Sequence, residues 1–249
     1  MSQLVPYEGG QVSALTDGDV VDFVRQAFDD VGIDQSNLTK IKIPTGGGSA
    51  FEVPTLGGSE FQRSIDAVIV FARPNQRAWY RVSYEESGGG SAPDCSSTDG
   101  VVGTGCRDLE VDEEGGEAQD YSCADCPWNQ WESKRLAGGR TGKGKDCAEL
   151  TYLYFFSGDQ LLPQMMIVPP TSVAEFKRYA VNLMKYGRKP QSVVTRISLI
   201  QDESSSGITY SKLHFDVAGS VPEDDQQKVT DLGAVVRHKF ADFNPLDQD

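Results

Sequence analysis

The sequence predicts a globular, mainly β protein of the α+β class, and three observations support this prediction. Its second half has strand and helix patterns in the order strand, strand, helix, strand, strand. Its composition, 38% hydrophobic and 24% charged, is typical of globular domains, and 249 residues can bury a large core. Since a helix between the third and fourth strands of a small barrel is the layout of the oligonucleotide-binding (OB) fold, we expect an OB-like five-stranded barrel.

A helix and a hairpin are expected before the barrel. Residues 15–32 place apolar side chains on one helical face, with Thr16 or Asp17 to cap the start and Gly32 to end the helix. Residues 38–54 alternate in polarity on both sides of three glycines, which predicts a hairpin. Residues 65–73 and 78–84 predict two strands joined by a turn at Pro74-Asn75.

The barrel continues after Cys147. Residues 149–157 and 161–168 predict strands with a turn at Gly158-Asp159. A helix over 169–187 is predicted, with a capping box of Ser172 and Glu175 and with Gly187 at its end. The last elements expected are a hairpin of 193–200 with 209–218 and a helix over 224–240. We therefore expect one OB-like domain over 1–240, a cysteine-rich zinc insertion over 88–149 and an acidic tail over 241–249.

The five cysteines predict a structural zinc site. Cys123 and Cys126 form a C-x-x-C pair, Cys147 closes the segment, and Cys95 is the preferred fourth ligand, with Cys106 as the alternative. All lie in polar, glycine-rich sequence, which argues against free buried cysteines. A redox C-x-x-C lacks the surrounding βαβ pattern, whereas an iron–sulfur cluster stays open as an alternative. His214 and His238 lie in a predicted strand and helix, away from this segment.

Positive charge is concentrated in one part of this acidic chain. The net charge is −14, yet residues 127–196 hold eleven Lys/Arg and five Asp/Glu. Segregation of this kind predicts a basic working surface, with solvated loops of mixed sign as the alternative. From Gly139 the sequence matches a phosphate-binding loop, but Asp146 stands where Ser or Thr is required. The cations expected to contact phosphates are Lys134, Arg135, Arg140, Lys143 and Lys145.

Aromatic side chains accompany these cations. Rings that stack on bases and cations that follow the backbone are the parts that bind single strands. The alternative is that the rings belong to the core, above all those of the strand over 149–157. The predicted contacts besides the five cations are Trp79, Tyr80, Arg81, Trp128, Trp131, Tyr152 and Tyr154.

The cysteine segments PDCSSTDG, CADCPWNQWESK and GKGKDC carry a resemblance. Their arrangement resembles that of the zinc-containing single-stranded-DNA-binding proteins of tailed phages, and the pattern is similar to one in phage proteins of uncertain role. The resemblance covers about a quarter of the chain. It implies an OB barrel, a zinc insertion beside the binding cleft and an acidic C-terminal tail. The family's better-known zinc members use a histidine with three cysteines, and no histidine lies near these segments.

We therefore expect a non-enzymatic protein that binds single-stranded DNA in phage-type replication or recombination. The acidic tail is expected to compete for the basic surface and to recruit replication or recombination proteins. The alternatives are a zinc-stapled structural or protein-interaction factor and a cluster-bearing nuclease, for which no catalytic signature is present. No apolar run approaches the ~20 residues of a membrane span, and the start MSQLVPYEGG does not predict a signal peptide. A cytoplasmic protein without a membrane role is expected.

Overall fold

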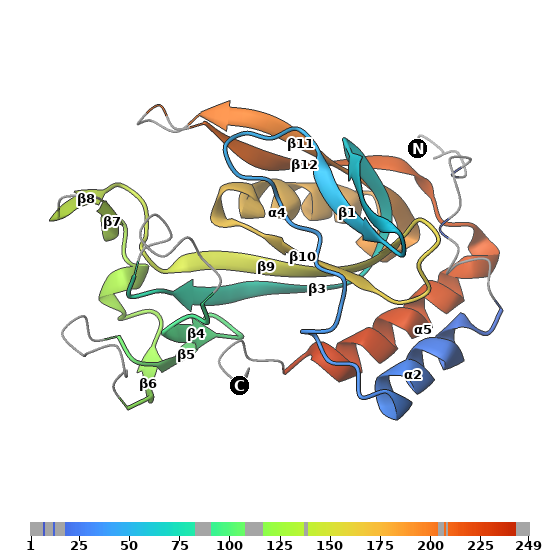
Figure 1. Cartoon of the computed structure of the whole chain (residues 1–249), viewed down its shortest axis with the longest axis horizontal. Helices are drawn as coiled ribbons and strands as arrows, with labels where there is room; N and C mark the ends of the chain where they lie inside the picture. The colour runs from blue at the N-terminus through green and yellow to red at the C-terminus, as the bar shows by residue number, and fades with distance from the viewer. Residues whose placement is uncertain are drawn as a thin grey trace. The chain divides into compact units, whose positions relative to one another are not determined.

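A computed structural model gives the fold, which has two compact units (Figure 1). The first unit comprises Met1–Ala72 and Tyr152–Ala241, and the second comprises Arg73–Thr151. The predicted insertion therefore lies within a unit that begins earlier in the chain than expected. The residues that the structure describes are 7, 12, 18–82, 91–107, 117–136, 139–203, 207 and 209–242. The predicted tail, apart from its first two residues, lies outside them.

The first unit is built on a mainly antiparallel sheet. Its strands lie in the order β10-β9-β3-β11-β12, and β11 pairs antiparallel with both β3 and β12. Among the described residues β10 and β12 are the edges, so the sheet is open and the predicted closed barrel is not confirmed. The strands are β3 (Ser64–Trp79), β9 (Ala148–Ser157), β10 (Gln164–Val168), β11 (Val193–Glu203) and β12 (Thr209–Ser220).

Helices cover both faces of this sheet (Figure 1). Helix α4 (Pro170–Lys185) packs on one face, where Phe176 meets Phe215 of β12. On the other face lie α2 (Val20–Asp30) and α5 (Glu223–Phe240). There Phe240 stacks on Tyr154 of β9, with the ring centroids 5.3 Å apart. Because both faces are covered, the central strand β9 is buried along most of its length rather than alternating between buried and exposed residues.

Several sequence predictions are confirmed and others are wrong. The last hairpin and the helices appear as expected, but residues 64–79 form one continuous strand. Asn75 takes a positive φ of 62°, which asparagine tolerates, so the strand passes through the expected turn. The capping box is also wrong, because α4 begins after Pro169 and the Ser172 hydroxyl accepts from the Leu213 N–H instead.

The ends of two helices show what sequence patterns can and cannot locate. α4 ends as predicted: Gly187 has a φ of +71°, and the Arg188 N–H donates to the Leu183 carbonyl at 3.0 Å. α2 is preceded by Asp19 rather than by Thr16 or Asp17, which lie outside the described residues. Phe23 of α2 is exposed, so not every apolar residue of the predicted helical face is buried.

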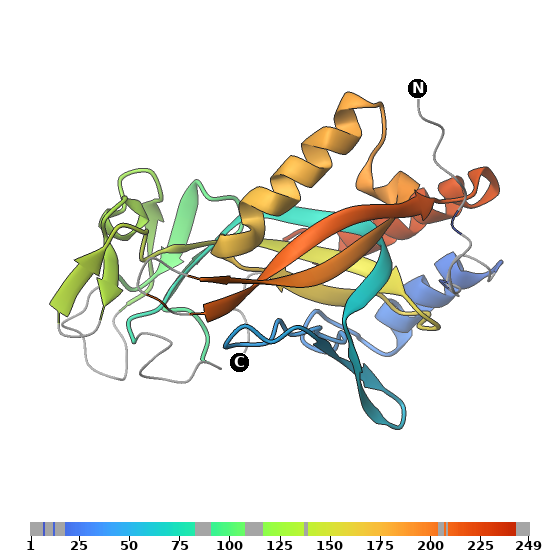
Figure 2. The ribbon, with the colours of Figure 1, turned by 90° about the horizontal axis from the view of Figure 1, so that it is seen from above.

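The hairpin predicted over residues 38–54 is not formed, because its second strand pairs with the segment that follows it in the chain. β1 (Phe51–Thr55) pairs antiparallel with β2 (Gly58–Gln62) through the turn at Leu56. The expected pairing across the three glycines is reduced to one bridge between Lys42 and Glu52. This β1–β2 hairpin projects from the first unit (Figure 2).

The second unit contains short strands and no α-helix among its described residues. The end of β3 pairs with β4, β4 with β5, and β5 with β6, all antiparallel. A separate hairpin, β7–β8, follows a 3₁₀ helix. These elements are β4 (Cys95–Ser97), β5 (Val102–Gly105), β6 (Gln119–Ser122), the 3₁₀ helix η1 (Pro127–Asn129), β7 (Lys134–Leu136) and β8 (Arg140–Gly142).

Candidate functional site

Four of the five cysteines meet at one small cavity in the second unit. Cys95, Cys123, Cys126 and Cys147 line it, and its volume is about 20 Å³, room for a single water-sized atom. All four are free thiols. Cys106 is also buried, but it does not line this cavity. The structure thus brings together the four cysteines that the sequence selects as ligands.

Backbone hydrogen bonds hold the C-x-x-C loop in place. The Cys123 N–H donates to the Val101 carbonyl at 2.9 Å, and the Cys147 N–H donates to the Trp128 carbonyl at 2.8 Å. The Asn129 side chain donates to the Cys123 carbonyl at 2.7 Å. η1, which follows Cys126, supplies both Trp128 and Asn129. These hydrogen bonds therefore join segments that are far apart in the sequence around the thiols.

The packing and the charges around the thiols are suited to a cation. A Cβ placed on Gly103 would lie 3.3 Å from Cys95 Sγ and 3.4 Å from Cys123 Sγ, so glycine leaves the two sulfurs room to approach. Burial raises the pKa of Cys95 to about 11 and that of Cys147 to about 12, and neighbouring thiols add to both shifts. An isolated cluster of this kind stays protonated, whereas a bound cation stabilises the thiolates.

The donor set fits zinc in its chemistry. Four thiol sulfurs are the usual ligands of structural zinc. Arg77 and Arg107 line the same cavity, and their positive charges would offset the negative charges of the thiolates. In the described part of the chain, no three Cys, His, Asp or Glu side chains already stand close enough to hold an ion. Binding therefore requires the four thiols to turn toward a common centre. His214 lies in the first unit, where it pairs with Asp216 at 3.0 Å.

Two tryptophans and an arginine form the interior beside the cysteines. Trp79 and Trp128 stack with their centroids 5.4 Å apart. The Arg135 guanidinium lies 5.1 Å from the Trp79 ring and 5.4 Å from the Trp128 ring. It also donates to the carbonyls of Tyr80 and Arg81. Arg135 is therefore committed to internal contacts rather than free to bind phosphate.

Asp146 is the residue on which these contacts converge, and sequence reasoning gave it no role. Its side chain is 5% exposed and accepts from Arg135 Nε at 2.6 Å and from Trp79 Nε1 at 2.9 Å. It also accepts from the Arg135 backbone N–H at 3.1 Å, and Lys134 Nζ lies 3.7 Å away. The one available signal was a single acid that follows two lysines and directly precedes Cys147.

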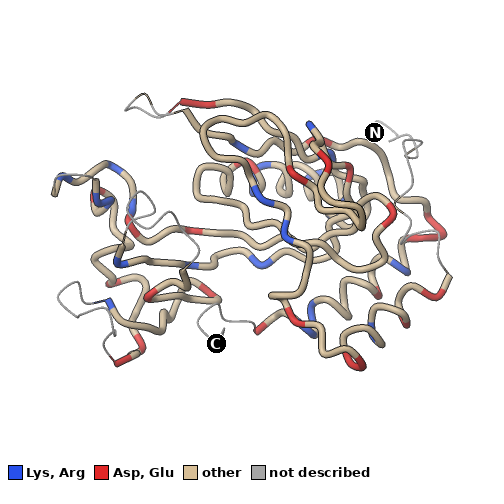
Figure 3. Tube along the Cα trace, in the orientation of Figure 1, with Lys and Arg blue, Asp and Glu red and all other residues tan. Residues whose placement is uncertain are grey.

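Several Lys and Arg residues lie along the β7–β8 hairpin (Figure 3), and an exposed ring accompanies them. Trp131 is 74% exposed, and Lys145 Nζ lies 5.6 Å from its ring centroid. Lys134, Arg140 and Lys143 are exposed as well. Tyr80 is partly exposed, whereas Arg81 pairs with Asp94 at 3.6 Å. These side chains, rather than the whole predicted set, are accessible to a partner.

Three of the residues predicted to contact nucleic acid are buried. These are Trp79, Tyr152 and Tyr154, and a buried ring cannot stack on a base. Tyr152 and Tyr154 belong to β9, where they fall within the first unit. The interpretation of the β9 rings as core is the correct one.

No protein-family model, curated protein or solved structure matches this chain. The resemblance to phage single-stranded-DNA-binding proteins therefore stays a prediction. No helix in the described part of the chain is both long and apolar enough to cross a membrane.

Proposed function

We propose that the chain binds single-stranded nucleic acid through the β7–β8 region of its second unit, and that zinc staples this unit. The observation that carries the proposal is Trp131, an exposed ring with the Lys145 ammonium beside it. An exposed ring supplies a stacking platform, and the neighbouring cations supply phosphate contacts. In this role the protein would act by binding alone, without catalytic residues.

Zinc would be held by Cys95, Cys123, Cys126 and Cys147. Its role would be structural: four sulfur ligands would close the coordination sphere and tie together segments that share little apolar contact. Elemental analysis of protein purified without chelators should give about one zinc per chain. Iron with visible absorption, or protein free of metal, would contradict this assignment.

The topology of the first unit is consistent with an OB-like origin. Counted along the chain, β3 is the first strand of the sheet, β9 the second, β10 the third, β11 the fourth and β12 the fifth. Across the sheet their order is third, second, first, fourth, fifth, and α4 lies in the chain between the third and the fourth. OB folds share this layout, and they bind oligonucleotides partly through the loop between the first and second strands. The second unit occupies that position in the chain, between β3 and β9. The first unit would then be an OB-like sheet that is not closed.

A fluorescence titration with oligo-dT tests the binding proposal. The three tryptophans of the chain are Trp79, Trp128 and Trp131, and the last is the exposed one. Stacking of a base should quench Trp131 emission. Trp131→Phe should abolish most of the signal while keeping part of the affinity, and Trp131→Ala should weaken binding by about 1–3 kcal/mol.

The charge contribution is tested by Lys143→Ala with Lys145→Ala. This double variant should weaken binding to all sequences alike and lower the salt slope. Arg63→Ala, which removes an exposed cation from the first unit, is the matched control and should leave both unchanged. Binding unaffected by the double variant would show that β7–β8 is not the contact.

A protein partner is the second candidate for the same surface. Leu136 in β7 is exposed, and so are Val101 and Val102 at the start of β5 in the same unit. Exposed apolar side chains of this kind suit a protein–protein contact. Absence of any DNA-induced change in a zinc-loaded sample would favour this candidate.

The acidic tail enters the proposal as a competitor. Residues 243–249 lie outside the described residues, and their sequence contributes two aspartates. Tethered to the same chain, they would see the cations of β7–β8 at high effective concentration. Displacement by nucleic acid would release the tail for replication or recombination partners.

A further inference from the structure

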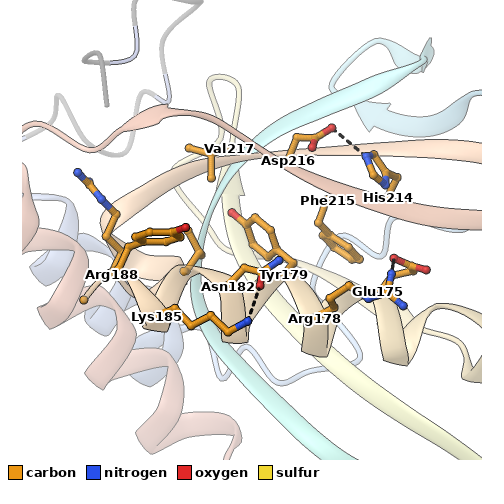
Figure 4. A pocket seen from close by; sticks show the side chains of 13 residues that line it. Glu175, Arg178, Tyr179, Asn182, Lys185, Arg188, His214, Phe215, Asp216 and Val217 are labelled. Carbon is orange, nitrogen blue, oxygen red and sulfur yellow. Dashed lines mark hydrogen bonds and ion pairs between the residues drawn. The ribbon is translucent and has the colours of Figure 1, made fainter. Parts of the chain in front are cut away.

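The first unit contains a groove between α4 and β12 (Figure 4). Its volume is about 1040 Å³. Buried apolar side chains of Tyr179, Leu183 and Phe215 form its floor. At its rim Tyr186 is 80% exposed. A ring exposed at the edge of an apolar floor is the kind of anchor that protein contacts use.

Cations mark one end of this groove. At the other end Glu175 pairs with Arg178 at 2.6 Å and with Lys212 at 3.3 Å, and Asp216 Oδ2 lies 3.0 Å from the His214 imidazole. Lys185 and Arg188 also line the groove, and within the described residues neither forms an ion pair. The groove therefore offers its positive end to an acidic partner.

The edge of β12 is directed into the groove. The Leu213 N–H donates to Ser172 of α4 at 2.9 Å and so points away from β11. Two residues along the strand, the backbone groups of Phe215 face the same way. Further along, the Tyr7 N–H donates to the Ser220 carbonyl at 3.3 Å, so this edge already accepts a backbone donor. An extended segment could add to it between these two points.

The β1–β2 hairpin, called the arm below, has the complementary properties. Phe51 and Val53 face the core, and the opposite face is exposed. Phe61, opposite Glu52 in the register, is 76% exposed on that outer face, and Leu56 at the turn is fully exposed. Within the described residues β2 pairs with β1 alone, so its other edge is free. The arm thus presents apolar side chains, a carboxylate and an unpaired strand edge.

We infer that the arm of one copy of this chain docks into the α4–β12 groove of another copy. Phe61 and Leu56 contact the apolar floor, and Glu52 lies toward Lys185 and Arg188. The arm and the groove are different surfaces of the same unit, although Phe51 and Val53 at the base of the arm share one core cluster with side chains of α4. Docking therefore joins copies head to tail, which makes an open chain unless the rotation closes a ring.

This self-association is independent of nucleic-acid binding. If the chain also binds single strands, neighbouring copies would bind cooperatively, as proteins of that kind commonly do. The test therefore uses the full chain without nucleic acid. Failure of the assembly would leave the binding proposal intact, and failure of DNA binding would leave the assembly intact.

Sedimentation velocity over a range of protein concentrations tests the inference with two blocked variants. Leu56→Asp with Phe61→Asp blocks the arm, and Tyr186→Asp blocks the groove. Each should weaken association at least about tenfold, because each substitution replaces an apolar contact of the docked surfaces by a charge that must lose water. Val31→Asp, an exposed apolar side chain of the first unit outside both surfaces, is the matched control.

The decisive sample is an equimolar mixture of the two blocked variants. The arm variant keeps a groove and the groove variant keeps an arm, so the mixture should form dimers and nothing larger. The wild type and Val31→Asp should form longer species as concentration rises. A wild type that is monomeric throughout, an arm variant that assembles like the wild type, or a mixture that stays monomeric would each overturn the inference. Since the substituted residues are exposed, circular dichroism should show all variants folded.

Discussion

Replacing Asp146 by alanine should destabilise the second unit and leave the first unaffected. The carboxylate accepts from Arg135 and from Trp79, and its removal leaves the buried indole N–H without an acceptor. Breaking a buried ion pair costs about 3–5 kcal/mol. The lower end applies because the Arg135 side chain is 25% exposed and retains the carbonyls of Tyr80 and Arg81. We expect a loss of about 3 kcal/mol, and a smaller loss for Asp146→Asn, which keeps one acceptor.

The distribution of chromophores lets each unit be followed separately. All tryptophans fall in the second unit, whereas all described α-helices fall in the first. In urea, tryptophan emission reports the second unit and far-ultraviolet circular dichroism reports mainly the first. A loss of about 3 kcal/mol should move the emission midpoint by about 1–3 M urea, given ordinary slopes. The dichroism midpoint should stay in place.

The matched control is Asp120→Ala, an exposed aspartate of the same unit. It accepts one bond, from the Thr104 hydroxyl at 2.7 Å, so its loss should change stability by less than about 0.5 kcal/mol. All proteins are compared at one zinc content. An Asp146→Ala emission midpoint within error of that of the control would show that this carboxylate does not stabilise the second unit.

Three further outcomes are expected. Cys126→Ser should abolish binding of the proposed zinc and lower the emission midpoint while sparing the dichroism midpoint. Gly105→Ala should cost more than about 2 kcal/mol by the emission midpoint, because its Cβ would lie 2.1 Å from the Asp94 carbonyl oxygen and its φ is +143°; Gly139→Ala, at φ +72° with open space around it, should cost about 1–2 kcal/mol. Deletion of residues 243–249 should raise affinity for oligo-dT at low salt, and the gain should shrink as salt rises; equal affinities across the salt range would refute the competing tail.

Elements with strong local signals were predictable from sequence. The β11–β12 hairpin and the end of α4 at Gly187 follow from alternation and from a glycine that takes the left-handed conformation. The turn at Pro74-Asn75 failed because asparagine can take a positive φ inside a strand as well as in a turn. The capping box failed because a tertiary donor, the Leu213 N–H, occupies the Ser172 hydroxyl.

The candidate site was predictable where chemistry alone limits the choice. Cysteines in polar sequence have few roles, and the four that were chosen line one cavity. The roles of individual cations were not predictable, because Arg135 and Lys143 look alike in sequence. Only the fold shows that Arg135 forms an ion pair with Asp146, whereas Lys143 is exposed. Burial of Trp79 depends in the same way on partners distant in the chain.

The path of the chain into the second unit has an evolutionary consequence. It enters along β3 and returns along β9, and these strands are neighbours in the sheet (Figure 1). The ends of the inserted segment, at Arg73 and Thr151, are thus the two sides of what would otherwise be a hairpin turn. A segment with adjacent ends can be gained, lost or exchanged without re-routing its host. The cysteine-bearing unit therefore has the anatomy of a guest domain, and a short turn in its place should leave the remaining strands able to pair.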